Sequence, residues 1–200
     1  MKPLLITYST REGQARRIAE HIEEYLRAKG ARAVISDVAG IAQLADFHPT
    51  DYEGVLVVAS VHNRRHADSA VQFARRHADA LNQLPSLFMS VSSAQILAES
   101  KGSSSALRHL GGSGAERLLE QFLSETGWHP THAYPVAGAI AYTKYRGLVR
   151  LGFQLVAYLT GLSTDLSRDH RYSDLSAIDR YVNELLSVID ARLPQAIPAA

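Results

Sequence analysis

The sequence contains no cysteine, which excludes disulfides, thiolate metal sites, iron–sulfur clusters and a cysteine nucleophile at once. It also lacks an excess of either charge, because 21 basic and 20 acidic side chains leave +1 at pH 7. Nucleic-acid-binding proteins normally carry a basic stripe, so nucleic acid is not an expected partner. The first residues show neither the basic start nor the apolar core of a secretory leader, which predicts a cytoplasmic protein.

Apolar residues make up 46% of the 200 positions and charged residues 20%, a composition typical of a folded globular protein. A chain of this length buries roughly 70% of its unfolded surface and needs no covalent staple. We expect a single domain over residues 1–193 and a tail over residues 194–200.

Short apolar runs that are typical of buried parallel strands alternate with segments of helical periodicity. The predicted strands cover residues 2–8, 31–38, 54–59, 86–91 and 134–140. The predicted helices cover residues 15–29, 68–81, 116–126 and 174–193, the first closed by Gly30 and the second capped by Asp68 or Ser69. This alternation predicts a parallel sheet between helices. Two segments do not fit it: a Ser/Gly-rich loop over residues 92–114 and an amphipathic insertion over residues 141–171.

The polar turn after the first strand reads Ser-Thr-Arg-Glu-Gly-Gln over residues 9–14 and directly precedes a helix. In an open parallel sheet, ligands bind beyond the carboxyl ends of the strands. A helix N-terminus offers unpaired N–H groups and about half a positive charge, which favours a phosphate. An ordinary capped turn without a ligand explains the same residues. The turn carries neither the dinucleotide motif Gly-x-Gly-x-x-Gly nor the triphosphate motif Gly-x-x-x-x-Gly-Lys.

Ser-Thr-x-x-Gly-Gln after a first strand resembles the phosphate loop of flavodoxin-like proteins. Further motifs resemble one branch of that superfamily, the quinone-dependent protoporphyrinogen IX dehydrogenases of haem biosynthesis. These motifs are Val58-Ala-Ser-Val61, residues 73–82, Pro85-Ser-Leu-Phe-Met-Ser-Val91, Ala137-Gly-Ala139, Tyr142-x-x-Tyr145-Arg146, Thr164-Asp165 and Tyr172-Ser-Asp174. The resemblance covers nearly the whole chain, from about residue 4 to residue 188.

The resemblance implies a doubly wound, five-stranded parallel sheet in the order 2-1-3-4-5, flanked by helices, and an FMN cofactor held by three loops. The residues that it assigns to FMN are Ser9, Thr10, Arg11, Glu12, Gly13, Gln14, Ser60, Val61, His62, Asn63, Arg64, Ser90, Val91, Ser92, Ser93 and Ala94. The first loop holds the phosphate, and the other two flank the flavin ring. The second loop reads His-Asn-Arg-Arg-His over residues 62–66 and lacks the aromatic residue and the glycine expected for the family.

The implied activity is oxidation of protoporphyrinogen IX to protoporphyrin IX, with menaquinone or ubiquinone as electron acceptor. An FMN-dependent NAD(P)H:quinone reductase shares the same loops and stays an alternative, as does a flavodoxin-like electron carrier. Such carriers are usually strongly acidic, which this chain is not. A flavin-free binding protein of the same fold is a third alternative. The sequence does not decide whether the chain forms a homo-oligomer.

The implied substrate carries two propionates, and the arginine fork matches carboxylates well. Arg64, Arg65, Lys144 and Arg146 are therefore candidates for binding the substrate, with solvated side chains as the alternative. No residue stands out as a general base. The catalytic candidates are His62 and His66, beside water or the quinone oxygen.

Residues 147–162 form an apolar segment in which Arg150 is the only charged residue. A helix over this segment is about 24 Å long, short of the ~30 Å hydrocarbon core of a bilayer. Its basic lead-in and its aromatic residues suit a helix in a membrane interface. Together with the resemblance, this pattern predicts a peripheral protein at the inner membrane surface. Packing of the segment on the sheet or on a second copy is the alternative.

The nine histidines include two close pairs, His62 with His66 and His129 with His132. Neither pair has the spacing of His-Glu-x-x-His, and neither is accompanied by a set of carboxylates. We therefore expect no metal site, and we interpret these residues as solvated loop histidines.

Overall fold

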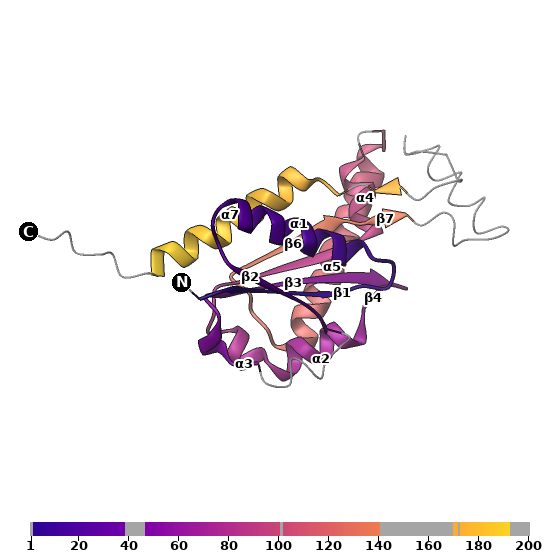
Figure 1. The fold of residues 1–200 in the computed structure, drawn as a ribbon. Coiled ribbons are helices and arrows are strands. Elements are labelled where there is room, and N and C mark those ends of the chain that lie inside the picture. The colour runs from indigo at the N-terminus through magenta and orange to yellow at the C-terminus, as the bar shows by residue number, and fades with distance from the viewer. Residues whose placement is uncertain (1, 39–46, 101, 141–169, 172, 193–200) are drawn as a thin grey trace, which may run out of the picture.

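The structure is a computed structural model that describes residues 2–38, 47–100, 102–140, 170–171 and 173–192. The predicted tail and the predicted insertion, apart from residues 170–171, lie outside these ranges. Within them, strands and helices alternate from the N-terminus to the last helix (Figure 1).

A parallel sheet lies at the centre of the described part of the chain. Its strands are β1 (Leu4–Ser9), β2 (Ala33–Asp37), β3 (Gly54–His62), β5 (Ser86–Ser92) and β6 (His132–Ala137). Their order is β2-β1-β3-β5-β6, which confirms the predicted order 2-1-3-4-5 when only parallel strands are counted. β5 is buried throughout and β3 over its first six residues, as expected where helices cover both faces of a sheet.

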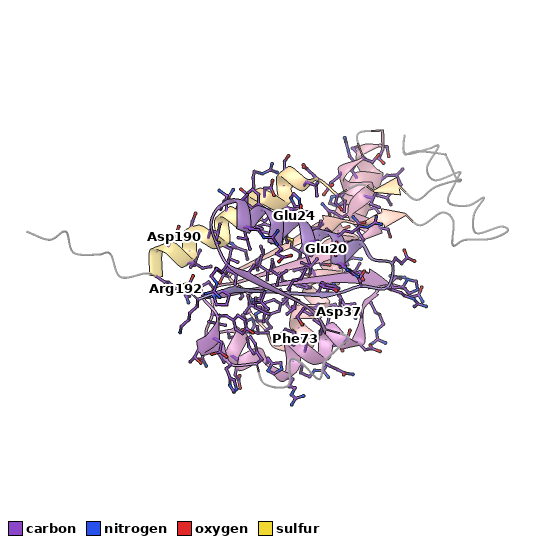
Figure 2. All side chains as sticks on the ribbon, in the orientation of Figure 1. Glu20, Glu24, Asp37, Phe73, Asp190 and Arg192 are labelled. Carbon is purple, nitrogen blue, oxygen red and sulfur yellow. The ribbon has the colours of Figure 1, made fainter. Side chains whose placement is uncertain are left out.

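Two helical layers cover the sheet, one on each face (Figure 1). One layer consists of α1 (Gln14–Ala28) and α7 (Leu175–Arg192), and the other of α2 (Asp68–Arg76), α3 (Ala78–Leu81) and α5 (Ser105–Thr126). Successive strand residues alternate between them, so that Leu4 packs with the first layer and Leu5 with the second. Figure 2 shows Phe73 in the second layer. The core therefore has two halves separated by the sheet.

The helix predicted over residues 15–29 is confirmed as α1, and Gly30 follows it in the left-handed conformation at φ +79°. The last helix is confirmed as α7, and Asp174 caps it, since its Oδ1 accepts hydrogen bonds from the N–H groups of the first turn. The helix predicted over residues 68–81 is divided at His77 into α2 and α3.

The cap predicted for the second helix is wrong. Ala67 is the N-cap residue of α2, and no side chain caps this helix. Ser69 uses its hydroxyl elsewhere, since it is hydrogen-bonded to Ser9 at the end of β1. The predicted fifth strand is also shorter than expected: β6 ends at Ala137, and β7 (Ala139–Ile140) pairs antiparallel with β8 (His170–Arg171).

The long loop predicted over residues 92–114 is wrong as well. α4 (Ser93–Glu99) occupies its beginning, and α5 (Ser105–Thr126) already starts within it. The serines that suggested a loop are helix caps instead, because Ser92 and Ser104 each accept a hydrogen bond from an N–H group three residues later. The segment is therefore a pair of helices joined by a short connection.

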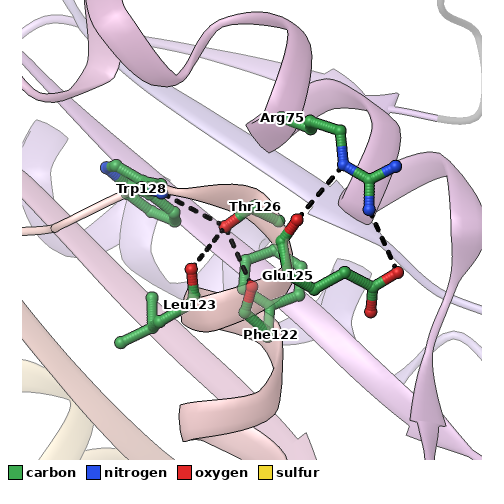
Figure 3. Close-up of polar contacts among 6 residues, drawn as sticks. All are labelled: Arg75, Phe122, Leu123, Glu125, Thr126 and Trp128. Atoms are coloured by element: carbon green, nitrogen blue, oxygen red, sulfur yellow. Dashed lines mark hydrogen bonds and ion pairs between the residues drawn. The ribbon is translucent and has the colours of Figure 1, made fainter.

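The C-terminal end of α5 is fixed to α2 and to the segment that follows it (Figure 3). Thr126 donates through its hydroxyl to the carbonyl of Phe122 at 2.9 Å and accepts the N–H of Trp128 at 3.4 Å. Arg75 forms an ion pair with Glu125 at 3.2 Å. These contacts hold Phe122 and Trp128, whose aromatic rings are fully buried beneath the sheet.

Candidate functional site

The polar turn between β1 and α1 forms the N-terminal cap of α1. Gly13 is the N-cap residue, in the left-handed conformation at φ +86°. Its N–H donates to Thr10 Oγ1 at 2.9 Å. A Cβ at Gly13 would meet no heavy atom within 4 Å, so the backbone faces open space. The first N–H groups of a helix lack intrahelical partners, and an open backbone beside them suits an anion.

Serine hydroxyls join the ends of the strands below this turn. Ser9 is only 2% exposed, and its Oγ lies 2.9 Å from Ser69 Oγ on α2. Ser60 donates its hydroxyl to the carbonyl of Ser9 at 3.2 Å. The structure therefore places Ser9 and Ser60 in contacts that connect β1, β3 and α2.

The second loop is the tip of a hairpin that the sequence did not reveal. The short strand β4 (Arg65–His66) pairs antiparallel with the end of β3. The two turn residues, Asn63 and Arg64, have positive φ angles of 50° and 63°. A type I′ turn has this conformation and favours Asn followed by Gly. Arg64 thus adopts the backbone that the expected glycine favours, at a cost of about 1 kcal/mol for a residue with a side chain.

His66 is buried, and the prediction of a solvated loop histidine is wrong for this residue. Its side chain is 7% exposed, and Nε2 is hydrogen-bonded to Ser90 Oγ at 2.9 Å. The ring packs against Phe88 and Phe122, with centroids 5.6 Å and 4.8 Å away. Burial lowers the pKa of His66 from 6.5 to about 4, so the ring is neutral at pH 7.

The residues predicted as the third loop form a direct junction between β5 and α4, because residues 90–92 end the strand and α4 begins at Ser93. Ser90 and Ser92 are buried, Ala94 is half-buried and Ser93 is exposed. The N–H of Gly138, just after β6, donates to the carbonyl of Ser92 at 3.0 Å. This junction is therefore held by α4 on one side and by the residue that follows β6 on the other.

The strand order brings the three loops to one edge of the sheet. In the register, the last residue of β1 lies opposite Ala59 of β3, and Ser60 lies opposite Val91 of β5. The predicted cofactor residues over 9–14, 60–64 and 90–94 therefore lie side by side. Of the predicted substrate residues, Arg64 and Arg65 lie exposed at this edge, whereas Lys144 and Arg146 lie outside the described residues.

Sequence reasoning missed three contributors to this edge, namely Ser69, Ser173 and Gly138. The amide of Gln14 donates to Ser173 Oγ at 2.9 Å, and Ser173 donates to the carbonyl of Ala137 at 2.5 Å. These bonds link the first turn of α1 to the segment before α7 and to the end of β6. The motifs Ala137-Gly-Ala139 and Tyr172-Ser-Asp174 are the sequence signals for this contact.

Among the described residues of this edge, the charged and histidine side chains do not form a metal centre. His62 is half-buried in the hairpin, while His66 is turned into the core contacts described above. Within the described residues, no group of three or more His, Cys, Asp or Glu side chains could hold a metal ion.

The fold and the three strand-end loops together define a flavodoxin-type α/β protein. A family model described as "Flavodoxin domain" matches residues 5–167, and the chain belongs to this family. Among solved structures, a rubredoxin oxygen:oxidoreductase from Desulfovibrio gigas has a TM-score of 0.53 at 12% identity, covering 97% of this chain and 38% of that one. At that identity, the likeness shows the fold alone.

The predicted resemblance to the quinone-dependent protoporphyrinogen dehydrogenases is confirmed. The chain is 27% identical to the protoporphyrinogen IX dehydrogenase (quinone) of Escherichia coli, over 93% of this chain and 96% of that protein. A protein of the same name from Leishmania major is 27% identical over 97% of this chain and 77% of its own length. No helix of the described residues is long and apolar enough to cross a membrane.

Proposed function

We propose that this chain oxidises protoporphyrinogen IX to protoporphyrin IX with bound FMN and delivers the electrons to a membrane quinone. The observation that carries this proposal is the similarity, over 93% of the chain, to a protein named protoporphyrinogen IX dehydrogenase (quinone). The same similarity covers 96% of that relative, so it involves the whole of that protein and not one domain of it. The three loops at one sheet edge supply a site of matching kind.

The turn over residues 9–14 fits the phosphate of FMN. The backbone beside Gly13 is open, and the first N–H groups of α1 follow directly. Arg11 is exposed and adds a positive charge to the turn. Thr10 fixes the conformation of Gly13 through its hydroxyl, and Gln14 ties the turn to the segment before α7. Ser9 supports the turn from within the sheet.

The hairpin over residues 60–64 and the loop over residues 90–94 flank the flavin ring in this proposal, because β3 and β5 are neighbours. Bound FMN supplies the two-electron chemistry that the protein's own side chains lack. The first backbone N–H groups of α4, at residues 93 and 94, stabilise negative charge on the pyrimidine part of the ring, because residues 90–92 are paired within the sheet. The protein's share is thus binding, orientation and electrostatics.

Arg64 and Arg65 bind the propionates of the substrate in this proposal. Both are exposed on the hairpin, at the edge where the ring-flanking loops lie. Residues held in a left-handed conformation persist where the surroundings over-determine them, and they cluster at functional sites. The strained backbone of Arg64 is one such position, and the residue is exposed at the tip of the hairpin. Lys144 and Arg146 complete the proposed set from the insertion.

The proton that leaves the substrate needs an acceptor, and His62 is the side chain best suited to this role. It lies half-buried on the hairpin, next to the turn that carries Arg64. His66 is unsuited, because its ring is buried and its Nε2 is hydrogen-bonded to Ser90. Water and the quinone oxygen stay as alternative acceptors.

The reaction transfers electrons from a poorly soluble tetrapyrrole to a lipid quinone. We therefore place the protein in the cytoplasm, peripherally at the inner membrane. The apolar segment over residues 147–162 is the proposed membrane contact. Deleting this segment is expected to abolish co-sedimentation with liposomes. Unchanged co-sedimentation would remove the membrane role of the segment without affecting the proposed reaction.

Porphyrin fluorescence tests the proposal directly. The purified chain, supplied with FMN, is mixed with protoporphyrinogen IX with and without a quinone under exclusion of oxygen. Quinone-dependent formation of fluorescent porphyrin above the rate of the protein-free control supports the proposal. Reduction of the flavin by a nicotinamide cofactor, without porphyrin formation, would instead favour the NAD(P)H:quinone reductase. Flavin binding with neither activity would favour the electron carrier.

A further inference from the structure

We propose that His66 is a positioning residue that fixes the spacing between the two ring-flanking loops through its hydrogen bond to Ser90. This inference rests on the proposed flavin site. His66 belongs to the hairpin and Ser90 to the strand that leads into the third loop. The hydrogen bond of 2.9 Å between Nε2 and Oγ thus connects the two segments that flank the flavin ring in the proposed site.

The hairpin needs such an anchor because its own pairing is minimal. β4 contributes only two residues, and one of them, Arg65, is exposed. The turn before it holds two residues at positive φ, which isolated chains adopt reluctantly. His66 is the buried member of β4, so it carries the contacts that hold the returning strand against the body of the protein.

The surroundings of His66 are built for a neutral ring with one polar contact. Phe88 and Phe122 contact the ring, and Phe122 belongs to the end of α5 that Figure 3 shows fixed by the Thr126 and Glu125 contacts. Ser90 is fully buried, so its hydroxyl requires a partner within the protein. A purely apolar residue at position 66 would leave that hydroxyl without its partner.

The charged groups that line the small space beside His66 are Arg65 on β4, Asp68 on α2 and Glu125 on α5. Glu125 is already paired with Arg75 at 3.2 Å. None of these groups forms an ion pair with His66 among the described contacts, in keeping with a ring that acts through shape and one hydrogen bond.

The test compares four single variants and one double variant in their binding of FMN and of riboflavin, which lacks the phosphate, with the thermal midpoint of unfolding measured in parallel. His66→Phe keeps a ring but removes the hydrogen bond, and Ser90→Ala removes it from the other side. His66→Gln keeps a side chain that can bond to Ser90. His77→Phe is the matched control, since His77 is a half-buried histidine packed on Phe73 between α2 and α3.

His66→Phe and Ser90→Ala are each expected to weaken the binding of FMN and of riboflavin by the same factor, about tenfold, the effect of one hydrogen bond. Combining them is expected to add nothing further, because both remove the same contact. His66→Gln is expected to bind within about twofold of the wild type, and His77→Phe to bind unchanged. An equal loss of affinity for FMN and for riboflavin shows that the substitution affects contacts with the flavin ring and not contacts with the phosphate.

Unchanged flavin binding by His66→Phe and Ser90→Ala, in a wild type that binds FMN, would overturn this inference alone. An equal loss of flavin affinity in His77→Phe would also overturn it, because His77 lies outside the ring-flanking segments. So would a loss of affinity for FMN alone, because such a loss would concern the phosphate and not the ring. If His66→Phe does not fold, Ser90→Ala with its own midpoint decides the question. A wild type that binds neither flavin would overturn the proposed cofactor site and this inference with it.

Discussion

Gly111 on α5 packs closely against α4, and replacing it with alanine gives a quantitative test. A Cβ at Gly111 would lie 2.8 Å from the carbonyl oxygen of Ala94, from the N of Ala98 and from Cβ of Leu97. Two of these three atoms are backbone, so α4 must move to make room. The neighbouring Gly112 offers a matched control, since its nearest contact is Ala98 Cβ at 3.8 Å, an ordinary van der Waals distance.

Alanine stabilises a helix interior by roughly 0.5–1 kcal/mol relative to glycine. Gly112→Ala is therefore expected to raise the free energy of unfolding by about that amount. In Gly111→Ala the same gain is opposed by overpacking, which costs roughly 1–3 kcal/mol. We expect Gly111→Ala to lower the free energy of unfolding by about 1 kcal/mol. The gap between the two variants is then about 2 kcal/mol, or roughly 4–8 °C in the thermal midpoint for a domain of this size.

Urea and thermal unfolding of the two variants measure this gap. Ala94 lies both beneath Gly111 and in the loop that we place against the flavin ring, so Gly111→Ala is also expected to weaken FMN binding while Gly112→Ala leaves it unchanged. Equal stability of the two variants would show that α4 does not pack against Gly111.

Three further predictions concern the candidate site. Gly13→Ala and Gly30→Ala place a side chain at φ +86° and +79° in open space, so each is expected to lower the free energy of unfolding by about 1 kcal/mol, but only Gly13→Ala should weaken FMN binding in a fluorescence titration. Arg64→Asn keeps a residue that tolerates the left-handed turn, so steady-state assays should show a raised KM for the porphyrinogen with unchanged stability; an unchanged KM would remove Arg64 from the substrate site. Burial lowers the pKa of His66 from 6.5 to about 4, so the unfolded chain is protonated at a higher pH than the folded chain. The free energy of unfolding should therefore fall by about 3 kcal/mol as the pH is lowered from above 6.5 to 4. The His66→Phe variant has no imidazole to protonate at this position, so its free energy of unfolding, measured with urea, should not show this part of the decrease.

The sequence was sufficient to predict the frame of the molecule, because its strands are continuous apolar runs. β5 is buried throughout and β3 over its first six residues, and helical periodicity identified α1 and α7 to within one residue at each end. The positions of the three loops follow from this frame, since neighbouring parallel strands end at the same edge of a sheet. What composition could not show was the use of serine and glycine. Ser92 caps a helix, and Gly111 permits a close helix contact, although both suggested a loop.

The hairpin escaped prediction for a different physical reason. A type I′ turn is normally recognised by a glycine at its second position, and here Arg64 occupies that position. Without that glycine, nothing in the sequence indicated that His66 lies on a returning strand and that its side chain is buried. Its burial depends on Phe88 and Phe122, which are distant in sequence, so only the folded chain shows it.

The proposed cofactor site requires a flavin phosphate at the turn between β1 and α1, and a paired titration tests this requirement most directly. The purified chain is titrated into FMN and into riboflavin, and the quenching of flavin fluorescence is followed. We predict that both ligands bind and that FMN binds at least tenfold more tightly, because only FMN reaches the first N–H groups of α1 and Gly13. Equal affinity for the two ligands, or no quenching of either, would contradict the proposed site.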